Sequence, residues 1–110
     1  MSQGTFTPVC SVDQILPNTG VAALVNGRHV AVFRVGADRF HAIDNIDPRS
    51  GASVLARGLI GNLGDRIVVA SPLYKQHFNL ETGECVEDAG VKVPAWKTRI
   101  EQGAVQILLS

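Results

Sequence analysis

The amino-acid sequence predicts an all-β protein, an antiparallel sandwich or barrel with two long loops and little helix. Short runs rich in valine, isoleucine and alanine are separated by single glycines and prolines, of which the chain has 11 and 5. No long run follows a helical period. The run VAALVNGRHVAVFRV also contains Asn26-Gly27, a pair that favours a two-residue hairpin because both residues tolerate positive φ.

Candidate strands follow one another along the chain, each ending at a turn signal. We expect them at residues 5–9, 20–25, 28–35, 39–43, 66–70, 77–80, 84–87, 97–101 and 104–109. After the Asn26-Gly27 turn, further turns are expected at Gly36-Ala37-Asp38, Gly64-Asp65, Thr82-Gly83-Glu84 and Gln102-Gly103.

Helical signals are few. In SVDQIL, residues 11–16, Ser11 can cap a short turn of helix while Gln14 reaches back to it, and Pro17 then stops the turn. The run VLARGLI, residues 54–60, is a second candidate for one helical turn. We therefore expect no helix long enough to form a layer of the fold.

The length and charge of the chain narrow the range of possible functions. The chain has 110 residues, which is the size of a single domain, so residues 1–110 are expected to form one domain that needs no metal or disulfide to fold. Its 10 basic and 10 acidic side chains balance, which argues against a nucleic-acid or anionic-membrane partner. The first residues show neither a signal peptide nor a membrane span, so we expect a cytoplasmic protein.

Two connections are longer than a hairpin turn, residues 44–65 and 71–76, and long ordered loops on a β scaffold are common positions for function. The chain has no nucleophile elbow, phosphate-binding glycine loop or dinucleotide fingerprint. His41 near Asp44 and Asp47 is a weak metal candidate, because a lone histidine sharing a strand face with Ile43 is usually packed or hydrogen-bonded.

The two loops, DPRSGA (residues 47–52) and SPLYKQHFNLETGE (71–84), resemble the two cluster-binding loops of the Rieske family. That family has C-x-H-x-G-A on the first loop, and C-P-x-H followed by an aromatic residue and a Thr-Gly turn on the second. FHAIDN, residues 40–45, is similar to the strand that precedes the first loop. The shared frame consists of Pro48, Gly51, Ala52, Pro72, Phe78, Leu80, Thr82 and Gly83. The resemblance implies a Rieske-like fold over most of the chain.

All four ligand positions of that family are changed. Asp47 and Ser71 stand where the family has cysteines, and Arg49 and Tyr74 stand where it has histidines. A Rieske [2Fe-2S] centre needs two thiolates and two imidazoles, and a guanidinium has no lone pair to donate. We therefore expect no cluster, metal or catalytic residue on this chain, which excludes an active electron carrier.

Within the Rieske family, one branch shares these departures: the small subunits of NAD(P)H-dependent assimilatory nitrite reductase. AIDN (residues 42–45), P-x-S-x-A-x-V-L-x-R-G-L-I-G (48–61) and S-P-L-Y-K-Q-x-F-x-L-x-x-G-x-C (71–85) are similar to that branch. The resemblance implies a non-catalytic subunit of an enzyme of nitrate assimilation that reduces nitrite to ammonia. Its partner would be a large catalytic subunit with FAD, a [4Fe-4S] cluster, sirohaem and NAD(P)H. The alternative is a free-standing interaction or adaptor module for another oxidoreductase.

Without a cluster, the two loops need another source of stability. We expect the ring of Tyr74 to fill the space between them against Pro48, Pro72 or Leu73. Asp47 is expected to accept backbone N–H bonds or to pair with Arg49.

The candidate partner interface lies at the tips of the same loops. It consists of Arg49, Tyr74, Lys75, Gln76 and His77. The alternative is that these are solvated tip residues without a partner.

Overall fold

The computed structural model describes residues 5–73 and 76–109, and its described part is nearly all β. Short 3₁₀ turns, η1 and η2, are its only helical elements among these residues. The elements in chain order are β1 (Thr5–Ser11), η1 (Val12–Gln14), β2 (Thr19–Val25), β3 (Arg28–Val35), β4 (Arg39–Asp44), η2 (Leu55–Arg57), β5 (Leu59–Leu63), β6 (Arg66–Ala70), β7 (His77–Asn79), β8 (Ala95–Trp96), β9 (Thr98–Glu101) and β10 (Ala104–Leu109).

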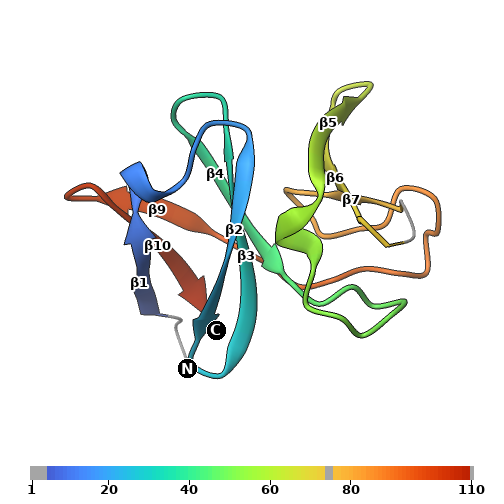
Figure 1. The fold of residues 1–110 in the computed structure, drawn as a ribbon, viewed down its shortest axis with the longest axis horizontal. Coiled ribbons are helices and arrows are strands. Elements are labelled where there is room, and N and C mark those ends of the chain that lie inside the picture. The colour runs from blue at the N-terminus through green and yellow to red at the C-terminus, as the bar shows by residue number, and fades with distance from the viewer. Residues whose placement is uncertain (1–4, 74–75, 110) are drawn as a thin grey trace.

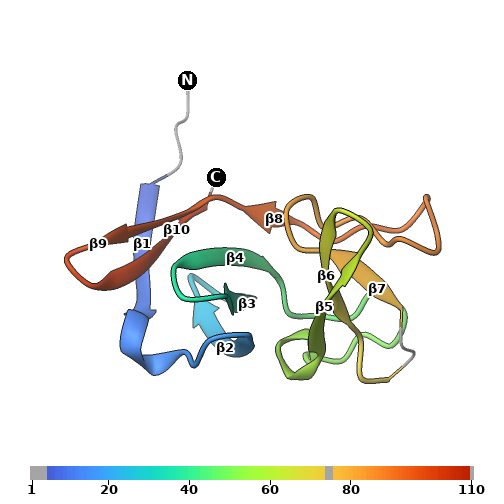
Figure 2. The ribbon, with the colours of Figure 1, turned by 90° about the horizontal axis from the view of Figure 1, so that it is seen from above.

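The strands form three antiparallel sheets, ordered β1-β10-β9, β2-β3-β4-β8 and β5-β6-β7 (Figures 1 and 2). The sheet of β2, β3, β4 and β8 is the middle layer. Because successive side chains of β3 point to opposite faces, Val30 and Val32 join one core while Ala31 and Phe33 join another. A strand covered on both faces explains the continuous apolar run in the sequence of β3.

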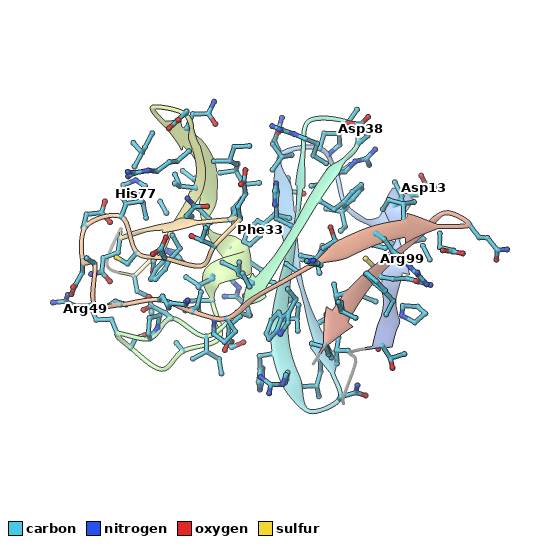
Figure 3. The ribbon with its side chains drawn as sticks, turned by 180° about the vertical axis from the view of Figure 1, so that it is seen from behind. Asp13, Phe33, Asp38, Arg49, His77 and Arg99 are labelled. Atoms are coloured by element: carbon cyan, nitrogen blue, oxygen red, sulfur yellow. The ribbon has the colours of Figure 1, made fainter. Side chains whose placement is uncertain are left out.

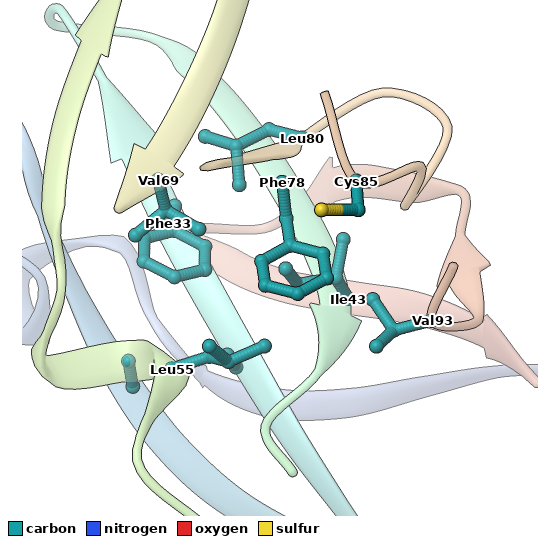
Figure 4. Close-up of a cluster of buried hydrophobic side chains, with 10 residues drawn as sticks. Phe33, Ile43, Leu55, Val69, Phe78, Leu80, Cys85 and Val93 are labelled. Atoms are coloured by element: carbon teal, nitrogen blue, oxygen red, sulfur yellow. The ribbon is translucent and has the colours of Figure 1, made fainter. Parts of the chain in front are cut away.

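The first core lies between the middle sheet and the sheet of β1, β10 and β9. It is formed by Ile15, Val25, Val30, Val32, Phe40, Ala42, Val105 and Ile107. The second core lies between the middle sheet and the small sheet of β5, β6 and β7 (Figure 4). Phe33, Leu55, Val69 and Phe78 meet there and are fully buried. The second core fixes the small sheet and both long loops to the rest of the molecule.

The local signals of the sequence are confirmed at the turns. Asn26 and Gly27 have φ of 51° and 80°, as a type I′ hairpin requires, and Gln102 and Gly103 have φ of 53° and 78°. The side chain of Gln14 accepts a hydrogen bond from the backbone N–H of Ser11 at 2.8 Å, as the capping motif predicts.

The expected strand at residues 84–87 is wrong. Glu84 and Cys85 form only isolated bridges, to Lys92 and Phe78, because the chain turns away before a ladder can extend. The helical turn expected at 54–60 is shorter, since η2 ends at Arg57 and the chain then enters β5. Strands β5 and β8 were not expected from the sequence. Among the described residues, no helix combines the length and apolar character needed to span a membrane.

Candidate functional site

The first long loop begins at Asn45, a buried side chain whose groups are all hydrogen-bonded. Its amide nitrogen donates to the Ser53 hydroxyl at 2.7 Å, and its side-chain oxygen accepts from the backbone N–H of Ala56 at 2.6 Å. Its backbone oxygen accepts from the N–H groups of Val54 and Leu55, both at 3.0 Å. Asn45 therefore ties the end of β4 to η2, which closes the loop between them.

Asp47 lies inside this loop and is fully buried, with 0% of its surface exposed. The loop turns tightly around it, because its backbone N–H donates to the Ala52 carbonyl at 2.8 Å and its carbonyl accepts from Gly51 at 2.7 Å. Its side-chain Oδ1 accepts the backbone N–H of Arg49 at 2.8 Å. The expectation that Asp47 holds the loop through backbone N–H bonds is thus confirmed.

Asp47 also joins the first loop to the second. The hydroxyl of Ser71, which is 1% exposed, donates to Oδ2 of Asp47 at 2.5 Å. The backbone N–H of Ser71 in turn donates to the Gln76 carbonyl at 2.8 Å and closes the second loop. The two positions at which the Rieske pattern has cysteines are therefore linked directly by a hydrogen bond, which sequence reasoning did not foresee.

The residues at these positions do not fit a Rieske cluster. The carboxyl group of Asp47 and the hydroxyl of Ser71 are hydrogen-bonded to each other, and neither side chain supplies a thiolate. Arg49 replaces an imidazole with a cation that has no lone pair. Within residues 5–73 and 76–109, no group of three or more histidine, cysteine, aspartate or glutamate side chains lies close enough to hold a metal ion.

The predicted partner interface divides into two places. Arg49 is exposed, Gln76 is half-buried, and both line a pocket of about 100 Å³ beside Pro48. His77 lies instead in a groove of about 370 Å³ beside Ser71. Arg49 and His77 are both at the end of the molecule opposite Asp13 and Asp38 (Figure 3). Tyr74 and Lys75, including the expected packing of the Tyr74 ring, lie outside the described residues.

His77 has a partner that the sequence did not suggest. Its backbone N–H donates to Oε1 of Glu87 at 2.8 Å, and its ring Nδ1 lies 2.5 Å from Oε2 of the same side chain. Burial raises the pKa of Glu87, but these hydrogen bonds from His77 outweigh it and hold the pKa below its usual value. Glu87 is ten residues away on an irregular segment, so no periodic pattern could have indicated the pair.

His41 is half-buried on β4, and its Nε2 is buried without a hydrogen-bond partner among the described residues. Burial lowers the pKa of His41, while Glu81 nearby acts in the opposite direction and Arg39 adds to the lowering. No described histidine, cysteine or carboxylate pair joins it as a metal site, and Asp44 instead accepts the backbone N–H of Ile46.

Comparison with known proteins places these observations in a family. Residues 5–108 match the Rieske-like [2Fe-2S] domain. The chain is 48% identical over 100 residues to the nitrite reductase (NADH) small subunit of Salmonella typhimurium, covering 90% of this chain and 93% of that protein. The chain belongs to the Rieske-like nitrite reductase small subunits.

Solved structures agree with this membership. The crystal structure of the putative NADH-dependent nitrite reductase small subunit from Mycobacterium tuberculosis superposes with a TM-score of 0.93 at 38% identity, over 100% of this chain and 98% of that one. The ferredoxin of carbazole 1,9a-dioxygenase from Nocardioides aromaticivorans has the same fold, with a TM-score of 0.83 at 24% identity over 96% and 99% of the two chains.

One further relative differs in length from the small subunits. The nitrite reductase [NAD(P)H] large subunit of Klebsiella oxytoca is 39% identical to this chain over 99 residues. The matched stretch spans 90% of this chain but only 10% of that protein. A domain similar to this small subunit therefore occurs within a much longer polypeptide that is named as a large subunit.

Proposed function

We propose that this chain is the non-catalytic small subunit of an NAD(P)H-dependent nitrite reductase and that it works by docking to the large catalytic subunit. In this proposal residues 1–110 form a single domain in the cytoplasm. The enzyme reduces nitrite to ammonia during nitrate assimilation. FAD, a [4Fe-4S] cluster, sirohaem and the NAD(P)H site belong to the large subunit, and this chain binds none of them.

The observation that supports docking most directly is the match to the Klebsiella oxytoca large subunit. When two domains belong to one polypeptide, the linker holds them at a high effective concentration. The Salmonella typhimurium relative is named as a small subunit and is matched over 93% of its own length, so a subunit of that kind lacks this linker and needs an interface that binds the large subunit on its own. The proposal therefore requires a docking surface on this chain.

The non-catalytic role is supported by the chemistry of the loops. Asp47 and Ser71 are buried and hydrogen-bonded to each other, so they hold the loops in place and present no reactive group at the surface. We propose that the loop tips form part of the docking surface. Its residues are Arg49, Tyr74, Lys75, Gln76 and His77.

Affinity purification tests this proposal. The tagged chain is expressed in its own cells, grown with nitrate or nitrite as the sole nitrogen source, and the retained proteins are identified by mass spectrometry. We expect a large sirohaem-containing polypeptide to be retained, and a Gln76→Glu variant to retain less of it. A tagged, unrelated protein of similar size is the control. Recovery of this chain alone, or with an unrelated oxidoreductase, would leave only the free-standing interaction module or adaptor.

A further inference from the structure

The outer face of the small sheet carries an exposed leucine, Leu59, at the start of a row of side chains that leads towards the loop tips. Strand register places Leu59 of β5 beside Ala70 of β6, and Ala70 beside His77 of β7. Leu59 is 81% exposed, the largest exposed fraction among the large apolar side chains described. Together with Pro72, this row lines the mainly apolar groove of about 370 Å³.

Leu59 does not pack against either core. Ile60, the next residue, points to the opposite face and packs against the second core, as the two-residue period of a strand requires. The backbone before Leu59 is also fixed. A Cβ atom on Gly58 would lie 2.1 Å from the Ala70 carbonyl oxygen, so β5 can begin this close to β6 only with glycine there. The sheet therefore holds Leu59 outward on a rigid support.

The rim of the groove carries a positive charge, that of Arg57. Arg57 is exposed beside Leu59, and its side chain makes no hydrogen bond or ion pair within the part of the chain that the structure describes. The other end of the groove is His77, whose ring is paired with Glu87. A fitting partner thus has an apolar side chain for the groove and a carboxylate near Arg57.

We propose that this groove, formed by Leu59, Ala70, Pro72 and His77 with Arg57 at its rim, is a main anchor site for the large subunit. The occupant is a segment of the large subunit with an apolar side chain next to a carboxylate. This inference rests on the proposed function, because it names the surface by which the small subunit docks. The groove meets the proposed loop-tip surface at His77, which belongs to both.

Two variants test the groove without altering the core. Leu59→Glu places a charge where an apolar contact is expected, at a side chain that is already exposed. Gly61→Lys adds a long side chain two residues further along the same face. Gly61 has no positive φ, and a Cβ atom there meets nothing within 4 Å, so this variant is expected to fold. The matched control is Leu24→Glu, an edge-strand leucine that is 70% exposed on the middle sheet.

The large polypeptide recovered with the wild-type chain is immobilised, and the Kd of each variant is measured by biolayer interferometry. We expect Leu59→Glu and Gly61→Lys to raise Kd at least about tenfold, as for residues at the centre of an interface, and Leu24→Glu to leave Kd within about twofold. Arg57→Glu should also raise Kd, and Arg57→Ala should make Kd depend less on the salt concentration. Circular dichroism confirms that each variant is folded.

The outcomes separate the two proposals. If the wild-type chain does not bind the large subunit, the proposed function and the anchor site both fail. If the wild type binds but Leu59→Glu and Gly61→Lys bind equally well, the anchor site is wrong while the proposed function stands. If Leu59→Glu abolishes self-association in analytical ultracentrifugation and leaves large-subunit binding unchanged, the face is a contact between two copies of this chain and the anchor site is again wrong.

Discussion

Replacing Ser71 by alanine tests whether the hydrogen bond to Asp47 joins the two loops. The variant removes one hydroxyl from a side chain that is 1% exposed and leaves Oδ2 of the fully buried Asp47 without its donor. Oδ1 keeps its bond to the Arg49 backbone, so the first loop itself is not opened. Serine and alanine have similar volumes, so the effect reports on the hydrogen bond more than on packing.

Leaving a buried polar atom without its hydrogen bond costs about 1–3 kcal/mol. We therefore expect the free energy of unfolding of Ser71→Ala to fall by about 1–3 kcal/mol. A domain of roughly this size loses about 4 °C of Tm per kcal/mol, so Tm should fall by about 4–12 °C.

Urea unfolding, followed by circular dichroism, measures the change through the midpoint at an unchanged slope. Ser50→Ala is the matched control in the first loop, because its exposed hydroxyl accepts only the Ala52 N–H at 3.1 Å, and it should stay within about 0.5 kcal/mol of wild type. A double-mutant cycle with Asp47→Ala should give a coupling energy of about 0.5–3 kcal/mol. If Ser71→Ala is as stable as Ser50→Ala and the coupling is near zero, the link does not hold the loops together.

Four further predictions follow from the structure. Gly58→Ala should lower the free energy of unfolding by about 3 kcal/mol, because its Cβ would clash with Ala70, and a wild-type urea midpoint would contradict this. Burial lowers the pKa of His41, so the unfolded state binds more protons than the folded state below about pH 6.5, and the wild-type protein loses stability there. The urea midpoints at about pH 7.5 and 5.5 should therefore differ less in His41→Gln than in wild type. The hydrogen bonds from His77 lower the pKa of Glu87, so the pair stabilises the folded protein above about pH 4.5 and this stabilisation is lost as the pH falls through the pKa of Glu87 in the folded state. Tm should therefore fall less steeply with decreasing pH in Glu87→Gln than in wild type. Equal slopes would refute the pairing. Excess EDTA should not change Tm, since Asp47 and Ser71, at the two former cysteine positions, are hydrogen-bonded to each other, whereas a drop of several degrees would reveal a structural metal.

Part of the fold was predictable because it depends on short-range chemistry. Asn26, Gly27 and Gly103 tolerate positive φ more readily than other residues, and the runs between such turns alternate or are continuously apolar as strands require. Strand β5 could not be predicted in this way. Its sequence, LIGNL, contains glycine and asparagine, which are poor strand formers, and its pairing with β6 imposes the extended conformation.

The candidate site shows the same division. The ligand positions were identified by the resemblance to the Rieske loops. The retention of the first loop by Asp47 could be inferred from its neighbours, because an aspartate in a tight turn bonds to backbone N–H groups two residues on. The Ser71 link spans 24 residues, and the His77–Glu87 pair lies between a strand and an irregular segment. Tyr74 and Lys75 remain predictions, since they lie outside the described residues.

By itself, the sequence determined the all-β class and the hairpin turns, because these depend on the conformational preferences of a few adjacent residues, and its resemblance to the Rieske loops identified the changed ligand positions. The tertiary structure alone decided which of those positions meet and which apolar side chains stay outside. Asp47 reaches Ser71 only when both loops are fixed by the second core, and Leu59 is exposed while Ile60 is covered only because β5 pairs with β6 in one register. Such contacts depend on the placement of distant strands, and no local pattern specifies that placement.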